Sequence, residues 1–258
     1  MACASFVLDT FIGTLPPKEG KLLYNSRVDP ILTFSCEVVL DVDEKSVQKV
    51  MDVQHLFIRR LLDVGSRSML ATLFTETGIM PLRFHCTKLA IRYLAYLGQL
   101  PSSHYVYAAL QESKSLLAAG FPCWIVDLNW VIAHLPGEGL HHVHVENMSP
   151  QNLLTLQDSL KRACDHFLQS FIDGSPKCVL LRRQLEMDGM VHVTRKLRHY
   201  LADPIIPTHR RAFTSIIFST HSLAIVRLRY QEHHQAPVPC EWRLRFMLCW
   251  FVRVIQVW

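Results

Sequence analysis

Residues 43–64 have the sequence DEKSVQKVMDVQHLFIRRLLDV, and this stretch gives the clearest indication of the fold class. Apolar residues recur at helical spacing, and the stretch opens with Asp43, a residue type that often caps the first turn of a helix. Gly65 follows the last apolar residues and is a candidate for the residue that ends the helix. The pattern therefore predicts a long helix with one wide buried face.

The same periodicity continues along most of the chain. It predicts further helices over residues 66–75, 81–100, 102–119, 127–134, 152–172, 177–187, 191–201 and 208–230. Residues 31–40, ILTFSCEVVL, have high β-propensity, but we favour a helix over a strand there. We therefore expect an all-α fold, an irregular multi-helix bundle in two helical groups with little or no sheet.

The division into two groups is expected at residues 136–150, which interrupt the helical pattern. This stretch has Pro136 and Pro150 at its ends and Gly137 and Gly139 between them, which favours a loop or linker. It would separate an N-terminal helical group, residues 1–135, from a basic C-terminal helical group, residues 151–240. Residues 241–258 follow as an unusually apolar tail, which we expect to be poorly packed and to promote aggregation.

Composition excludes several classes of protein. The chain has 258 residues, of which 50% are hydrophobic and 19% charged, so we expect a folded core and exclude intrinsic disorder. The eight cysteines include no Cys-x-x-Cys pair, and we expect most of them to be small core residues. No apolar run reaches the ~18 residues of a membrane span, and residues 1–10 lack the basic start of a signal peptide. We expect an intracellular protein, nuclear or cytoplasmic, that is not secreted and does not contact a membrane.

Motifs for catalysis and for phosphate binding are missing from the sequence. It contains no G-x-x-x-x-G-K-[ST], no G-x-G-x-x-G and no Asp-Asp pair of the kind that a two-metal polymerase centre needs. His141, His142, His144 and Glu146 lie close together, but they lie in the predicted loop, where no rigid element would hold metal ligands. We therefore expect no enzyme activity, no cofactor and no specific metal site.

Positive charge is concentrated in the last third of the chain. Residues 177–230 contain ten Lys or Arg and three Asp or Glu, a net charge of +7, whereas residues 1–176 have a net charge of −3. The cations either form a surface that binds nucleic acid or simply face water, and charge alone leaves both interpretations open.

The candidate nucleic-acid contacts are the clustered cations of this segment and one aromatic residue. They are Arg182, Arg183, Arg195, Lys196, Arg198, Tyr200, Arg210 and Arg211. On a helix, much of the 195–200 cluster would cover one side, and cations beside an aromatic ring suit phosphate contact and base stacking. The alternative is that Leu197 and Tyr200 pack in the core while the cations face water. We expect contact with RNA or DNA without strong sequence preference.

A resemblance to a known family rests on sequence blocks that occur in a fixed order. The blocks are CEVV at 36–39, RRLL at 59–62, SRSM at 66–69, LFTETGIMPLR at 73–83, RHYL at 198–201, Thr214-Ser215, STH at 219–221 and LRY at 228–230. Over about residues 19–242 the chain resembles the region downstream of the polymerase domain in non-LTR retrotransposon reverse transcriptases of the fungal type. The resemblance implies a role in holding the RNA template or target DNA, with the missing polymerase portion as the ancestral partner.

The chain departs from this family at both ends. It has no polymerase domain with a catalytic Asp pair, and Arg245-Phe246-Met247 stand where the family's zinc motif would have Cys-Arg-Phe-Cys. The resemblance is therefore to a severed, non-catalytic fragment of a mobile element. Two alternatives stay open, a helical protein-interaction module and a nonfunctional pseudogene product.

Overall fold

The structure is a computed structural model that describes residues 15–40, 42–137, 140, 145, 148–175, 178, 181, 195–202 and 206–218. All regular elements in these residues are helical, and none of the described residues lies in a strand. The predicted all-α fold class is confirmed. None of the described helices is both long and apolar enough to cross a membrane.

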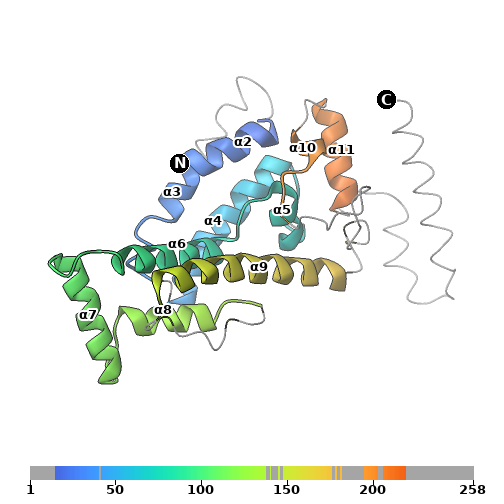
Figure 1. Cartoon of the computed structure of the whole chain (residues 1–258). Coiled ribbons are helices and arrows are strands. Elements are labelled where there is room, and N and C mark those ends of the chain that lie inside the picture. The colour runs from blue at the N-terminus through green and yellow to red at the C-terminus, as the bar shows by residue number, and fades with distance from the viewer. Residues whose placement is uncertain are drawn as a thin grey trace, which may run out of the picture. The chain divides into compact units, whose positions relative to one another are not determined.

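Figure 1 shows the helices in their order along the chain. They are α2 (Pro17–Leu23), the π-helical turn η2 (Tyr24–Val28), α3 (Asp29–Leu32), α4 (Glu44–Leu62), α5 (Leu70–Thr77), α6 (Leu82–Leu97), α7 (Tyr105–Ala118), α8 (Trp124–Ala133), α9 (Pro150–Gly174), α10 (His199–Ala202) and α11 (Pro207–Ile217). Of the predicted helices 177–187, 191–201 and 208–230, large parts lie outside the described residues.

The predicted helix at 43–64 is confirmed as α4. The Asp43 carboxylate accepts hydrogen bonds from the backbone amides of Lys45 and Ser46, at 3.3 and 3.2 Å, and so caps the first turn. The predicted C-cap at Gly65 is wrong, because α4 ends at Leu62 and its C-cap is Asp63, which adopts the left-handed conformation with φ of 54°. Aspartate enters this region more readily than most residues because its short polar side chain can hydrogen-bond locally.

Near the start of the described residues, around α2 and α3, the structure differs from the sequence prediction. Residues 31–40 form neither the helix that we favour nor a strand, since α3 ends at Leu32 and successive turns follow it. Ser35, with φ of 63°, interrupts the helical path there. The preceding helix α2 has Gly20 in its interior, which weakens the helical signal. The structure explains this glycine, because a Cβ there would collide with the side chain of Leu61.

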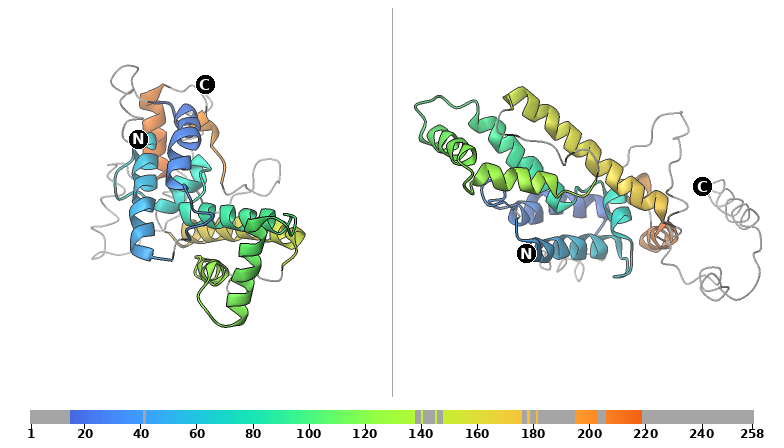
Figure 2. Two further views of the ribbon diagram at one scale, coloured as in Figure 1. Left: turned by 90° about the vertical axis from the view of Figure 1, so that its left-hand side faces the viewer. Right: turned by 90° about the horizontal axis from the view of Figure 1, so that it is seen from below.

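The core draws residues from most of the described helices, and α6 and α9, which run side by side, make the most extensive contact between helices (Figures 1 and 2). Phe84 and Ile91 of α6 and Leu160 and Leu168 of α9 belong to one buried cluster. The helices that precede and follow residues 136–150 therefore share a core, although we expect a division into two groups at this point. Cys36, Cys86, Cys164 and Cys178 are buried, as expected for small core residues.

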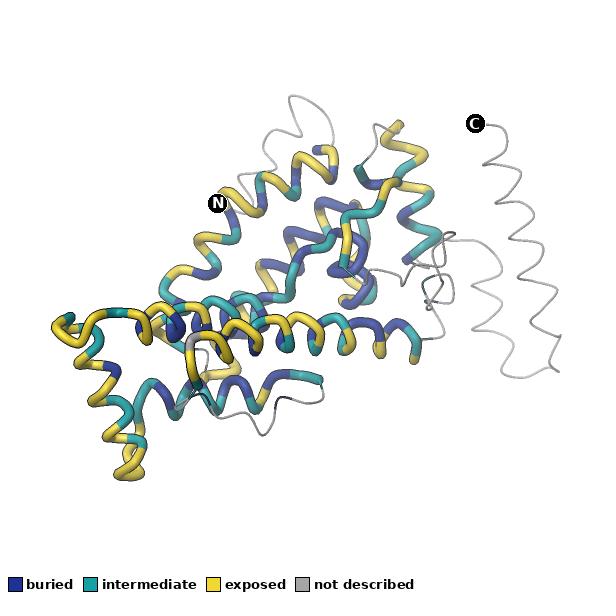
Figure 3. The backbone as a smooth tube through the Cα atoms, viewed as in Figure 1, coloured by how far each residue is buried: buried dark blue, intermediate teal, exposed yellow. Residues whose placement is uncertain are grey.

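Burial differs strongly among the helices (Figure 3). Seven of the eight residues of α5, from Ala71 to Thr77, are buried, whereas Leu110 is the buried residue of α7. Helix α5 is thus enclosed by its neighbours, and its polar groups need partners within the protein.

Candidate nucleic-acid interface

The eight predicted contact residues fall into three places. Arg182 and Arg183 lie outside the described residues. Arg195, Lys196, Arg198 and Tyr200 belong to residues 195–202, which we name the clasp, and Arg210 and Arg211 belong to α11. The expectation that the 195–200 cluster covers one side of a helix is wrong, because residues 195–198 precede α10 and have no helical backbone.

The clasp is bound through its backbone to the end of α5. The amides of Lys196 and Arg198 donate to the carbonyls of Thr75 and Glu76, at 3.2 and 3.1 Å. Carbonyls in the last turn of a helix have no partner within that helix, so the clasp supplies one. Gly78 permits this close approach, since a Cβ on it would lie 3.0 Å from the backbone nitrogen of Leu197.

Arg198 and Tyr200 are bound to a buried carboxylate. Glu76 has a side chain that is only 2% exposed, and it receives Arg198 Nε at 3.2 Å and the Tyr200 hydroxyl at 2.9 Å. Burial raises the pKa of Glu76, while the charge of Arg198 and the two hydrogen bonds oppose that rise. Burial, together with Glu76, also raises the pKa of Tyr200. These two predicted contact residues therefore hold the clasp against α5.

Arg195 connects the clasp to α9. Its guanidinium pairs with the carboxylate of Asp165, and its side chain is 8% exposed. Lys196, the next residue, is exposed. Sequence patterning could not separate these two neighbours, because their difference depends on Asp165, which lies 30 positions away.

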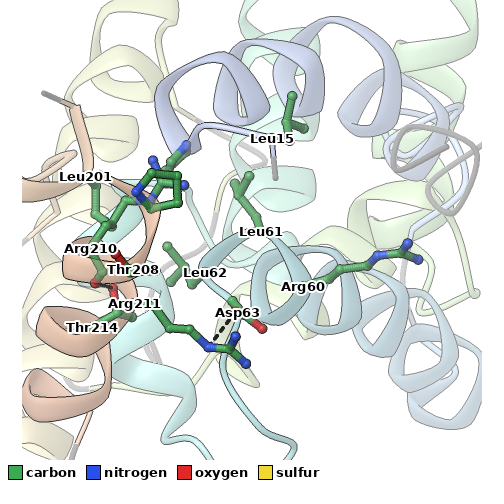
Figure 4. Close-up of a pocket in the computed structure, with 12 residues that line it drawn as sticks. Leu15, Arg60, Leu61, Leu62, Asp63, Leu201, Thr208, Arg210, Arg211 and Thr214 are labelled. Carbon is green, nitrogen blue, oxygen red and sulfur yellow. Dashed lines mark hydrogen bonds and ion pairs between the residues drawn. The ribbon is translucent and has the colours of Figure 1, made fainter. Parts of the chain in front are cut away.

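Helix α11 places its two arginines near acidic residues of other helices. Arg211 Nε lies 2.8 Å from Asp63 Oδ2 at the end of α4, and both side chains are well exposed, at 67% and 50%. Arg210 is half-buried, and burial lowers its pKa while the charge of Glu19 on α2 opposes the change. Both arginines line a pocket of about 370 Å³ next to the end of α4 (Figure 4).

Sequence analysis missed Lys21, which lies beside the clasp. A Cβ placed on Gly78 would lie 3.0 Å from Lys21 Nζ and 3.1 Å from the carbonyl carbon of Lys196. Burial, and then the charge of Arg195, lower the pKa of Lys21. The sequence gave no reason to group Lys21 with residues 195–211, from which it is distant along the chain, and no helix was predicted at residues 17–23.

We give the name basic edge to four cations that are at least partly exposed, Lys21, Lys196, Arg210 and Arg211. Helix α10 in the clasp contacts both α2 and α11, so it joins the parts of the chain that contribute these four residues. Two acidic side chains, Glu19 and Asp63, lie beside the arginines, whereas Lys21 is held next to another cation.

The predicted absence of a metal site is not resolved by the described residues. Within that part of the chain, no three His, Cys, Asp or Glu side chains gather in a way that could hold a metal ion. The dense group His141, His142, His144 and Glu146 lies outside it, as does the whole tail, residues 241–258.

No protein-family model, curated protein or solved structure matches this chain. The resemblance to reverse transcriptases therefore stays a prediction. The structure adds one relation between its blocks: residues 73–83 and 198–201 contact each other through Glu76, Arg198 and Tyr200.

Proposed function

We propose that this chain is a non-catalytic helical module that holds the sugar-phosphate backbone of RNA or DNA at the basic edge. This is the role implied by its resemblance to the region downstream of the polymerase domain in non-LTR retrotransposon reverse transcriptases. The proposal narrows the contacts expected from sequence, since Arg195, Arg198 and Tyr200 are bound to Asp165 and Glu76 within the protein.

The observation that supports the proposal is the crowding of like charges around the clasp. Burial, and then the charge of Arg195, lower the pKa of the half-buried Lys21, although Arg195 is itself paired with Asp165. The exposed Lys196 follows Arg195 directly in the chain, and its backbone lies against the same glycine as Lys21. A phosphate group placed there would bring negative charge to Lys21 and Lys196, in addition to the carboxylate of Asp165 that already pairs with Arg195.

The contact is with the backbone and not with base edges. The basic edge joins a helix, an extended segment and a second helix, and α10 between them has only four residues. The four residues of the basic edge come from α2, from the segment before α10 and from α11, so within the described part of the chain they do not lie along one recognition helix, as contacts in a major groove would. Sequence preference is therefore weak, and affinity depends on salt.

The test is a fluorescence-anisotropy titration of the full chain with a single-stranded RNA and with duplex DNA at several salt concentrations. The unmodified chain binds at low salt, and its affinity falls as salt rises from roughly 50 to 200 mM. The double variant Lys21→Ala, Lys196→Ala binds more weakly, and its log–log salt slope on duplex DNA is flatter by about 0.9 for each phosphate that it no longer neutralises.

The matched control is the double variant Lys45→Ala, Lys49→Ala. It removes two exposed lysines from the first part of α4, while the pocket-lining residues lie at the other end of that helix. The control keeps the affinity and salt slope of the unmodified chain. Equal losses in the two double variants, or no binding at low salt, would refute the proposal.

A second candidate function is docking of a polymerase portion of the kind found in the family that the chain resembles. The observation in its favour is a short exposed apolar segment, in which Phe34, Val38 and Val39 are 83%, 59% and 69% exposed. Apolar side chains that gather on a surface often mark protein contacts. In a pull-down with the immobilised polymerase portion of such an element, the unmodified chain would be retained and the Phe34→Ser, Val39→Ser variant would not. Failure to retain the unmodified chain would exclude this candidate.

A further inference from the structure

We propose that the pocket beside the end of α4 binds the terminal nucleotide of a single strand, with its phosphate on Arg210 and Arg211 and its base on the apolar floor. This inference rests on the proposed function, because nucleic acid held at the basic edge is what would bring such an end to the pocket. It adds a ligand class, and it places Arg210 and Arg211, which were already candidate contacts from the sequence, in a pocket that the sequence did not predict.

The pocket has the size and the lining of a small-molecule site. Its volume of about 370 Å³ lies within the range of ligand pockets, and a space of this size accepts one nucleotide but not a base pair. The floor is apolar and combines side chains from three parts of the chain, Leu15, Leu61, Leu62 and Leu201. Such a floor favours a flat, weakly polar group such as a base over a bare inorganic ion.

The charged side of the pocket suits a phosphate. Figure 4 shows Arg211 extending from α11 to Asp63, with Leu61 and Leu62 next to them, whereas the guanidinium of Arg60 points away from Arg210 and Arg211. A guanidinium group can offer paired N–H donors to the oxygens of a phosphate, and Arg210, like Arg211, lies near an acidic side chain, Glu19, with which a phosphate would compete. The pocket also lies at the N-terminal end of α11, where the helix dipole favours an anion.

The internal ion pair at this site is exchangeable. Arg211 and Asp63 are both well exposed, so their pairing contributes little free energy, and a doubly charged phosphate can displace the single carboxylate. A terminal phosphate carries more charge than an internal phosphodiester, and a terminal, unpaired nucleotide leaves its base free to reach the floor. These two properties select a phosphorylated single-strand end.

The experiment measures binding of the full chain to a dinucleotide with a 5′-phosphate and a fluorescent label at the other end. The same dinucleotide without the phosphate is the ligand control. The structure leads us to expect tighter binding of the phosphorylated form, by about tenfold, and loss of this preference in Arg210→Ala, Arg211→Ala. Equal binding of the two dinucleotides would overturn the inference.

Asp63→Asn tests the exchange directly. Asparagine tolerates the left-handed conformation that residue 63 adopts, so the end of α4 is kept while the competing charge is removed. The phosphorylated dinucleotide binds this variant several-fold more tightly, because Arg211 no longer pairs with an internal carboxylate. Unchanged or weaker binding, with the thermal stability preserved, would argue against Arg211 as the phosphate ligand.

Two further measurements separate the pocket from the basic edge as a whole. Adenosine 5′-monophosphate competes with the dinucleotide far better than inorganic phosphate does. Equal competition by the two would overturn the role of the apolar floor.

The double variant Lys21→Ala, Lys196→Ala keeps binding of the dinucleotide while it weakens binding of longer RNA. An equal loss of dinucleotide binding in this variant would overturn the assignment to the pocket, whereas intact RNA binding in it would refute the proposed function alone.

Discussion

The clasp and α11 both bring arginines of the basic segment against acidic side chains of earlier helices, but at very different depths. The Arg198 and Glu76 side chains are 14% and 2% exposed, whereas those of Arg211 and Asp63 are 67% and 50% exposed. The same pair of residue types is therefore a fixed structural contact in one place and an exchangeable contact in the other. Water screens the exposed pair, while the buried pair must compensate the desolvation of both charges.

The largest effect is expected for Arg198→Ala, which tests whether the buried ion pair with Glu76 stabilises the fold. Removing one partner of a buried ion pair leaves the other charge uncompensated, which costs about 3–5 kcal/mol. We expect the free energy of unfolding to fall by that amount in urea denaturation followed by circular dichroism. A loss below about 1 kcal/mol would place Arg198 with the exposed cations.

Gly78→Ala tests whether binding of the clasp to the end of α5 depends on the close backbone approach at Gly78 as well as on the ion pair. Residue 78 has φ of 67°, and a Cβ there would meet the backbone of Lys196 and Leu197. Strain in the left-handed region and displacement of the clasp together lower the stability by about 1–3 kcal/mol. The measurement is the same urea denaturation. Gly65→Ala is a suitable control, because it meets nothing within 4 Å and has no positive φ.

The pH dependence of the free energy of unfolding tests whether burial raises the pKa of Glu76. Its pKa in the folded protein is raised above the usual 4.5. The folded state therefore binds more protons than the unfolded state between these two values, and this group makes the stability fall as the pH rises from about 4.5 toward the raised pKa. The slope from a single group is at most about 1.4 kcal/mol per pH unit.

Glu76→Gln removes that contribution while it keeps the shape of the side chain. The free energy of unfolding of the unmodified chain, minus that of the variant, therefore decreases as the pH rises above 4.5. Urea denaturation at stepped pH gives both values. A difference that is constant with pH, or that increases, would contradict the assigned shift.

The smallest effect is expected for Arg211→Ala. An exposed ion pair contributes about 0–1 kcal/mol, and salt screens it further. Its removal should leave the urea midpoint close to that of the unmodified chain, with any difference disappearing at high salt. A loss comparable to that of Arg198→Ala would show that the α11 pair is structural and would remove the contrast.

Sequence patterning predicted the helices best where local interactions decide them. In α4, Asp43 caps its own helix within three residues, and the apolar face repeats over many turns. Patterning failed at residues 31–40, where intrinsic preference favours regular structure but Ser35 adopts a positive φ. It also failed at the end of α4, because either Asp63 or Gly65 could have ended the helix.

The candidate site shows the same limit more strongly. Sequence analysis located the cations of the clasp and α11 but did not separate Arg195 and Arg198 from cations that face solvent. It left open whether Leu197 and Tyr200 pack in the core, and in the structure both pack against the core. It also left out Lys21, which is distant in sequence and lies beside the clasp in space. The information that separates these residues lies in their partners, and Glu76 is 122 positions from Arg198.

The sequence by itself determined the all-α class, most helix positions and the segment in which positive charge is concentrated. Helix formation depends mainly on residues within a few positions of each other, and the net charge of a segment is a count of its residues. The linear sequence is therefore enough to predict both. Only the tertiary structure decided which cations are bound inside the protein and which remain at its surface. That outcome depends on burial and on contacts between distant residues, because the same ion pair has a different free energy in the interior and in water.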